Sequence, residues 1–384
     1  MAERKNNESR SRQTQTRRTP MSEHEVLRNA PSRYRKRRPR SINMALVLLT
    51  VLLVATLAAS VIHIVRLSGE AIHNHKEHIE EAVNSEKEQM NPEKEEPKLQ
   101  EIVLSSEEVF RGDLILVNYE TPYVFPEDES ELVYVSEHKT DDYRVAYPDF
   151  RLDSDVVEVF NDFVSDLNEA TGERCLLVNS TYRSFEQQQA TYDDYVTNHG
   201  QAAAEKYVAD PGNSEHHTGL AMDLTIMLDD GTYQKMADYE HYGVINTVCV
   251  EYGFIHRYPA TKENITRISS EPWHYRYVGV PHSYVISKER LCLEEYIVSI
   301  KDYTIDGKLK LVDSEGKLGE CDLNTLPEVG YVIYYVPGGE GDTVLSIPTE
   351  ADSYTVSGNN TDGFVVAVTF GEMTLPEISF AIVG

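Results

Sequence analysis

The chain has 384 residues and a formal net charge of −28, from 36 lysines and arginines against 64 acidic residues. Residues 1–40 carry 13 basic and 4 acidic side chains, a net of +9, and subtracting this from the total leaves −37 for residues 41–384. The strong negative charge of residues 41–384 excludes a globular nucleic-acid-binding protein. A hydrophobic content of 40% excludes a wholly disordered chain.

An apolar run at residues 44–65 predicts a transmembrane helix. Its 22 residues include no Asp, Glu, Lys or Arg, and as a helix it would be roughly 33 Å long, the thickness of a bilayer core. The basic residues before it predict a cytoplasmic N-terminus, with residues 67–384 outside the cell. We therefore expect a single-pass cell-membrane protein with a basic cytoplasmic arm at 1–40 and an acidic stalk or linker at 67–108. A cleavable signal peptide is the alternative.

Residues 109–303 have the pattern of an α+β domain. Apolar residues at helical spacing over 156–167 predict an amphipathic helix, which Asp153 or Ser154 would cap and Gly172 would end. Residues 175–180 and 221–228 read as strands, and residues 184–200 and 233–253 as helices. Because helices and strands do not alternate regularly, an α+β arrangement is expected.

Residues 304–384 change to short β-rich runs separated by Gly, Pro, Asn and Asp. The runs lie at 308–313, 330–337, 343–348, 353–358, 363–370 and 378–384. This pattern predicts a small all-β domain, and it contains no catalytic constellation. We expect an accessory wall-binding or spacer module.

Four cysteines, Cys175, Cys249, Cys292 and Cys321, all lie on the predicted outer side of the membrane. Disulfides persist there, and four cysteines allow three pairings. Apolar neighbours make buried free thiols an equal alternative.

Three segments place polar side chains inside sequence that otherwise resembles a core. His216 and Asp223 lie seven positions apart, with the small residues Gly219 and Ala221 between them. Glu271 and His274 flank Pro272 and the only tryptophan, and Arg183 directly follows a predicted strand. Each feature alone is more often structural. Together they provide two histidines and a carboxylate for a metal, a second carboxylate and a cation.

Two histidines and one aspartate can hold zinc and leave the fourth tetrahedral position for water. Zinc lowers the pKa of such a water toward about 7, so that Glu271 could take its proton and pass it to a leaving amine. The charge of Arg183 suits a developing oxyanion or a terminal carboxylate on a substrate. The helical H-E-x-x-H motif of common metalloproteases is absent.

These residues resemble the paired signatures of the VanY-like D-alanyl-D-alanine carboxypeptidases, zinc peptidases of bacterial cell walls. The motif S-x-H-x-x-G-x-A-x-D occurs at 214–223 and E-x-W-H at 271–274, while Y-R-S at 182–184, followed by Gln188, matches the upstream arginine motif. The resemblance covers about residues 112–300. One local ambiguity is His217 beside His216; spacing to Asp223 favours His216 as the ligand.

The resemblance implies one zinc ion per catalytic domain, held by His216, Asp223 and His274. It implies Glu271 as general base, Arg183 as stabiliser of the tetrahedral intermediate, and Ser214 and Gln188 as substrate-binding residues. The expected function is removal of the terminal D-Ala from peptidoglycan stem pentapeptides by a membrane-anchored enzyme.

Two other functions stay open at this point. Relatives with these motifs differ in bond preference, so an L,D-carboxypeptidase acting on tetrapeptides is one alternative. A non-catalytic wall-binding protein on the same fold is the other, although a pure binding module has no need of Glu271. Stem peptides and the membrane are the expected partners, with no nucleic acid and no protein partner predicted.

Overall fold

The computed structural model describes residues 97–376 and scattered positions between 48 and 76. The basic arm at 1–40, most of the linker and the run at 378–384 lie outside the described residues. Of the predicted membrane helix, residues 48–49, 52–53, 55–63 and 65 are described, and they are helical. Within these described positions, no helix has the length and apolar character needed to cross a bilayer.

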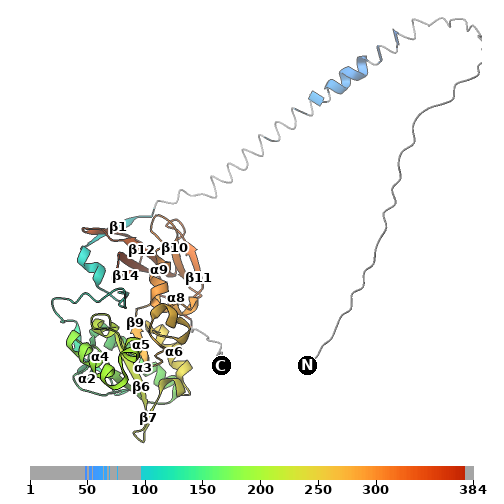
Figure 1. Ribbon diagram of the computed structural model, residues 1–384. Coiled ribbons are helices and arrows are strands. Elements are labelled where there is room, and N and C mark those ends of the chain that lie inside the picture. The colour runs from blue at the N-terminus through green and yellow to red at the C-terminus, as the bar shows by residue number, and fades with distance from the viewer. Residues whose placement is uncertain are drawn as a thin grey trace, which may run out of the picture. The chain divides into compact units, whose positions relative to one another are not determined.

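A six-stranded mixed sheet forms the centre of the catalytic part, with strand order β3-β5-β6-β9-β8 and β7 paired to β6 (Figure 1). Its strands are β3 (Arg144–Val145), β5 (Leu176–Ser180), β6 (Ala221–Met227), β7 (Tyr233–Gln234), β8 (Phe254–His256) and β9 (His274–Tyr277). Only the β3–β5 pair is parallel. A small separate sheet joins β2 (Leu132–Tyr134) to β4 (Arg151–Asp153).

Helices and short 3-10 turns accompany this sheet, in agreement with the predicted α+β arrangement. The helices are α2 (Val135–His138), α3 (Ser154–Thr171), α4 (Phe185–His199), α5 (Gln201–Tyr207), α6 (Tyr242–Glu251), α7 (Glu263–Thr266), α8 (His282–Glu289) and α9 (Leu293–Ile300). Short 3-10 turns are η1 (Ser106–Phe110), η2 (Glu215–Thr218), η3 (Met236–Asp238) and η4 (Ala260–Lys262). The predicted ends of α3 are confirmed: Asp153 accepts a bond from the Asp155 amide, and Gly172 closes the helix with φ 76°.

The helix predicted at 233–253 is wrong in its first half. A turn at 228–232, closed by the bond from the Leu228 amide to the Thr232 carbonyl (2.9 Å), folds Tyr233 and Gln234 back onto β6. These residues therefore pair as β7, and α6 begins only at Tyr242. Helical spacing of apolar residues did not reveal this, because the hairpin is set by the turn.

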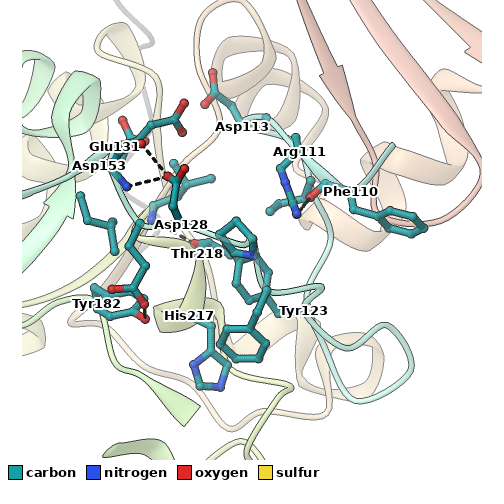
Figure 2. A pocket seen from close by; sticks show the side chains of 18 of the residues that line it. Phe110, Arg111, Asp113, Tyr123, Asp128, Glu131, Asp153, Tyr182, His217 and Thr218 are labelled. Atoms are coloured by element: carbon teal, nitrogen blue, oxygen red, sulfur yellow. Dashed lines mark hydrogen bonds between the residues drawn. The ribbon is translucent and has the colours of Figure 1, made fainter. Parts of the chain in front are cut away.

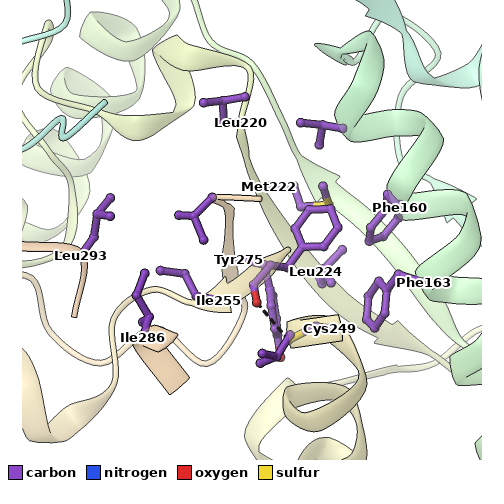
Figure 3. Packing of buried hydrophobic residues seen from close by; sticks show 14 of the residues in the cluster. Phe160, Phe163, Leu220, Met222, Leu224, Cys249, Ile255, Tyr275, Ile286 and Leu293 are labelled. Carbon is purple, nitrogen blue, oxygen red and sulfur yellow. Dashed lines mark hydrogen bonds between the residues drawn. The ribbon is translucent and has the colours of Figure 1, made fainter. Parts of the chain in front are cut away.

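Buried side chains from α3, α6, β6 and β9 make one core beside the sheet. Figure 3 shows Phe160 and Phe163 of α3 facing Met222 and Leu224 of β6, with Cys249 nearby. All four cysteines are free thiols, and Cys175, Cys249 and Cys292 are buried. The free-thiol alternative is thus the one observed.

Residues 309–370 form a five-stranded antiparallel sheet of order β11-β10-β12-β15-β14. The strands are β10 (Leu309–Asp313), β11 (Leu318–Cys321), β12 (Gly330–Pro337), β14 (Ser353–Gly358) and β15 (Gly363–Phe370), with β13 (Thr343–Pro348) outside this sheet. Five of the six β-rich runs are confirmed as strands, and β11 was not predicted.

Both faces of the central strand β12 are buried. Along β12, Val332 and Tyr334 face a core that belongs to the sheet's own domain. Ile333 and Tyr335, which alternate with them, belong to the same core as the catalytic part. The β-rich region is therefore packed onto the catalytic part.

The predicted linker at 67–108 contains a strand in its last part. β1 (Leu99–Leu104) pairs antiparallel with β13, from Leu99 opposite Pro348 to Leu104 opposite Thr343. The chain thus contributes β1 to the β-rich C-terminal region before it continues into the catalytic part.

Candidate active site

The sheet brings the three predicted metal ligands together. His216 lies in η2, Asp223 in β6 and His274 at the start of β9, and Asp223 is directly opposite His274 in the β6–β9 pair. Gly219 ends η2 with φ 77°, and a side chain there would clash with Leu132, with a Cβ to Cδ2 distance of 2.5 Å. This turn delivers His216 to the strand that carries Asp223.

One donor atom from each of these three residues lies within 4.8 Å of the others. Asp223 Oδ2 is 3.5 Å from His216 Nε2, and Asp223 Oδ1 is 3.1 Å from His274 Nδ1. His216 Nε2 is buried without a hydrogen-bond partner. Buried polar atoms are normally paired, so two histidine nitrogens and a carboxylate that face one another fit a zinc ion.

Hydrogen bonds of the other ring nitrogen of each histidine determine which nitrogen points at this site. His216 Nδ1 donates to the Thr181 carbonyl oxygen at 2.7 Å, which leaves the Nε2 lone pair free. His274 Nε2 donates to the Glu215 carboxylate at 3.3 Å, so Nδ1 is the ring nitrogen that faces Asp223. Such outer hydrogen bonds orient metal-binding histidines and raise their basicity.

Glu215 contacts the candidate ligand His274, and the sequence prediction did not include it. It is fully buried, and its Oε1 accepts from Arg257 Nε at 2.7 Å and from Arg276 Nη1 at 3.2 Å. Burial opposes its charge, but the two arginines outweigh burial and hold its pKa well below the usual range. Glu215 therefore stays ionised behind His274. The available signal was its position between Ser214 and His216 in the motif.

Glu271 lies beside the ligand set, with Oε2 3.8 Å from His274 Nδ1. Its backbone is held by bonds to the Tyr258 carbonyl (3.0 Å) and from His256 Nε2 (3.1 Å). Burial raises the pKa of Glu271 to about 7, and Asp223 adds to the rise while His274 opposes it. A carboxylate with a pKa near neutrality can both take and return a proton.

Arg183 is tied to the same site through its backbone. Its amide donates to the His216 carbonyl at 3.1 Å, and its own carbonyl accepts from His217 Nδ1 at 2.6 Å. Burial lowers the pKa of its guanidinium, whereas Asp223 and Glu271 act in the opposite direction. Its Nε is buried without a partner. A cationic donor is thus available close to both carboxylates.

A cavity of about 310 Å³ joins these groups. Its walls include the three candidate ligands, Glu271, Arg183, Ser214, Gln188, Tyr258 and Trp273. Ser214 Oγ accepts a bond from the His216 amide at 3.3 Å. Gln188 donates to the Ala209 carbonyl at 2.7 Å, and its Oε1 is buried and unpaired. Every residue predicted for the site therefore lines one cavity.

A larger cavity of about 620 Å³ is lined by His217, not by His216 (Figure 2). His217 Nε2 accepts from the Gly212 amide at 3.0 Å, so neither ring nitrogen of His217 is free to join the ligand set. This agrees with the choice of His216 from spacing.

The fold and site are those of a zinc carboxypeptidase of the VanY class, and comparison with known proteins agrees. The VanY model, described as D-alanyl-D-alanine carboxypeptidase, matches residues 149–280. A D-alanyl-D-alanine carboxypeptidase of Enterococcus faecium is 31% identical over 297 residues, which cover 77% of this chain and 84% of that protein. The chain belongs to the VanY family.

One solved structure supports the same similarity, and a second is similar in sequence. The vancomycin resistance D,D-dipeptidase VanXYg, crystallised with a D-Ala-D-Ala phosphinate analogue, is 33% identical and has a TM-score of 0.60; the match covers 71% of this chain and 99% of that chain. A VanY D,D-pentapeptidase variant from a VanB-type resistance cassette, in complex with Zn(II), is 35% identical with a TM-score of 0.40, covering 48% and 98%.

Proposed function

We propose that this chain is a zinc D-alanyl-D-alanine carboxypeptidase that removes the terminal D-Ala from peptidoglycan stem pentapeptides. The observation that carries the proposal is a single cavity lined by the ligand triad, Glu271 and Arg183. Membership of the VanY family and the name of the Enterococcus faecium relative support the substrate class.

Zinc bound by His216, Asp223 and His274 would supply a Lewis acid that polarises the scissile carbonyl and acidifies water. Glu271 takes a proton from the attacking water, whose oxygen adds to the carbonyl carbon. The same carboxyl then gives this proton to the amine of D-Ala as the C–N bond breaks, so the products are a tetrapeptide and D-Ala. A nearby cation lowers the raised pKa of Glu271, which favours its basic form at neutral pH.

Arg183 and two polar residues supply the contacts to the substrate. The guanidinium of Arg183 stabilises negative charge on the oxygen of the tetrahedral intermediate. Gln188 has an unpaired Oε1 in the cavity that can accept an N–H from a peptide. The Ser214 hydroxyl accepts from the His216 amide and keeps its own hydrogen to donate. Buried and unpaired groups of this kind favour a ligand that satisfies them.

We propose further that the enzyme is anchored in the cell membrane by residues 44–65, with residues 1–40 in the cytoplasm and the catalytic part outside. The support is the uncharged run and the basic excess before it. Protease treatment of intact cells tests this placement. Digestion of the catalytic part while the N-terminal arm survives is the expected result, and protection of both parts contradicts it.

A peptidase assay tests the activity. The purified full-length chain, loaded with zinc, is incubated with a muramyl pentapeptide ending in D-Ala-D-Ala and, in parallel, with the corresponding tetrapeptide. We expect D-Ala release from the pentapeptide, loss of release with a chelator and recovery with added zinc. Release from the tetrapeptide alone would assign an L,D-carboxypeptidase instead. Zinc binding without turnover of either peptide would assign a non-catalytic binding protein.

A further inference from the structure

Residues 111–125, which we call the strap, run between the C-terminal domain and the active site. Arg111, Asp113 and Tyr123 mark its course along one side of the larger cavity (Figure 2). Helices and strands are absent from this described segment. Hydrogen bonds to neighbouring parts of the chain must therefore hold the strap in place.

The C-terminal domain holds the strap through the end of β14 and the loop at 359–362. The Ser357 hydroxyl accepts from the Leu114 amide at 2.8 Å, and the Gly358 amide donates to the Arg111 carbonyl at 2.8 Å. Asn360 is 6% exposed, and its Nδ2 donates to the carbonyls of Leu116 (2.8 Å) and Pro122 (3.0 Å). One side chain thus clamps two points of the strap.

The backbone of this loop is shaped for the contact. Asn360 has φ 62°, a left-handed conformation that asparagine tolerates better than most residues. At Gly358 a Cβ would lie 2.2 Å from the Val109 carbonyl oxygen, so only glycine allows this approach.

Beyond Pro122, the strap packs on the residue that holds Arg183. The ring of Tyr123 stacks on His217 with centroids 6.3 Å apart, and Phe125 lies 5.0 Å from the same ring. Tyr123 and His217 both line the larger cavity (Figure 2). His217 in turn donates to the Arg183 carbonyl. The position of the strap therefore bears on the candidate oxyanion-stabilising residue.

The strap also reaches the residue behind His274. Arg276 Nη2 donates to the carbonyls of Asp113 (2.8 Å) and Ile115 (3.0 Å), while its Nη1 donates to Glu215. Glu215 accepts from His274 Nε2. A second contiguous set of hydrogen bonds thus joins the strap to a metal ligand.

We infer that the C-terminal β domain is a positioning element of the active site, and that Asn360 is a positioning residue that acts through the strap. Asn360 fixes the strap, and the strap fixes His217 and Arg276, on which Arg183 and Glu215 depend. This role differs from the accessory wall-binding or spacer module expected from sequence. It deepens the proposed function and rests on it for the activity readout.

Two variants and a control test this inference in the full-length chain. Asn360→Gly removes the clamp and keeps the left-handed backbone, and Asn360→Asp keeps the shape but replaces the donor by an acceptor. Val332→Ala is the control, because Val332 is fully buried in the C-terminal domain's own core and outside the strap. Melting temperature, kcat and KM on the pentapeptide, and amide hydrogen exchange over residues 111–125 are measured for each.

Both Asn360 variants are expected to lose about tenfold to a hundredfold in kcat/KM, the cost of misplacing catalytic groups by about an ångström. Exchange over 111–125 should quicken in both. Val332→Ala should lower the melting temperature with kcat/KM and strap exchange unchanged at assay temperature. The inference is overturned if the Asn360 variants keep wild-type kcat/KM, or if Val332→Ala loses as much.

Hydrogen exchange separates this inference from the proposed function. If the wild type releases no D-Ala, the proposed function fails. Faster exchange at the strap and around His217 in the Asn360 variants alone would still support the positioning role. Exchange equal to wild type in those variants would refute that role whatever the activity.

Discussion

Replacing Glu215 by glutamine removes one negative charge from the buried group behind His274 and keeps the side chain's shape. Arg257 retains a second partner, because its Nη1 and Nη2 bind Glu294 at 2.8 and 2.7 Å. Arg276 then donates only to backbone carbonyls and to the neutral side-chain amide of the glutamine. The change therefore removes the buried carboxylate to which the Arg276 guanidinium donates.

The loss in the free energy of unfolding can be calculated approximately from these contacts. Removing one partner of a buried ion pair costs about 3–5 kcal/mol, and we expect about 3 because glutamine still accepts a hydrogen bond. For a folded unit of this size, that lowers the melting temperature by about 6–12 °C. His274 Nε2 also loses its charged acceptor, which should weaken zinc binding by about 10–100-fold.

Thermal melting followed by circular dichroism and zinc competition against a chromophoric chelator measure the two effects. Glu320→Gln is the matched control, since Glu320 is exposed and pairs with Lys308 at the surface. Pairs of that kind contribute about 0–1 kcal/mol. A folded Glu215→Gln protein that binds zinc within twofold of wild type and melts like the control would refute the role given to Glu215.

Three further predictions concern single residues. Glu271→Ala should keep zinc, measured by atomic absorption, and lose about 10²–10⁴-fold in kcat; wild-type turnover would remove it as the base. Arg183→Lys should lose about 10²–10³-fold in kcat, and an effect confined to KM would assign Arg183 to substrate binding alone. Burial raises the pKa of Asp113 to about 6, so its carboxyl destabilises the fold once pH rises from about 4 through 6. Asp113→Asn should therefore raise the melting temperature at pH 7.5 and leave it unchanged at pH 3.5, and equal shifts would contradict this.

Local sequence predicted much of the catalytic part because its signals are short-range. The apolar spacing at 156–167, with Asp153 and Gly172 at the ends, was sufficient to place α3. The motif residues could be assembled into one site because small residues at Gly219 and Ala221 imply a close turn into a strand. Resemblance to the VanY family then joined segments that the sequence alone leaves apart.

Long-range pairing set the limits of prediction. Nothing near Leu99 indicates that its partner is Pro348, so the sequence predicts a linker where β1 forms. Glu215 occupies an unassigned position of the motif, and its role depends on Arg257 and Arg276, which approach only in the folded sheet. Asn360 gave no signal for the same reason, since its acceptors at Leu116 and Pro122 belong to a distant segment.

The pairing of β1 with β13 bears on how the protein is made. During synthesis Leu99 emerges long before Pro348, so β1 has no partner until most of the chain has left the ribosome. The contacts that hold the strap form later still, because Asn360 follows β13 in the sequence. Contacts between residues that are far apart in the sequence form late and slow the folding of the chain. A nascent chain that does not yet include Asn360 would thus contain the candidate metal ligands but lack the side chain that holds the strap at Leu116 and Pro122.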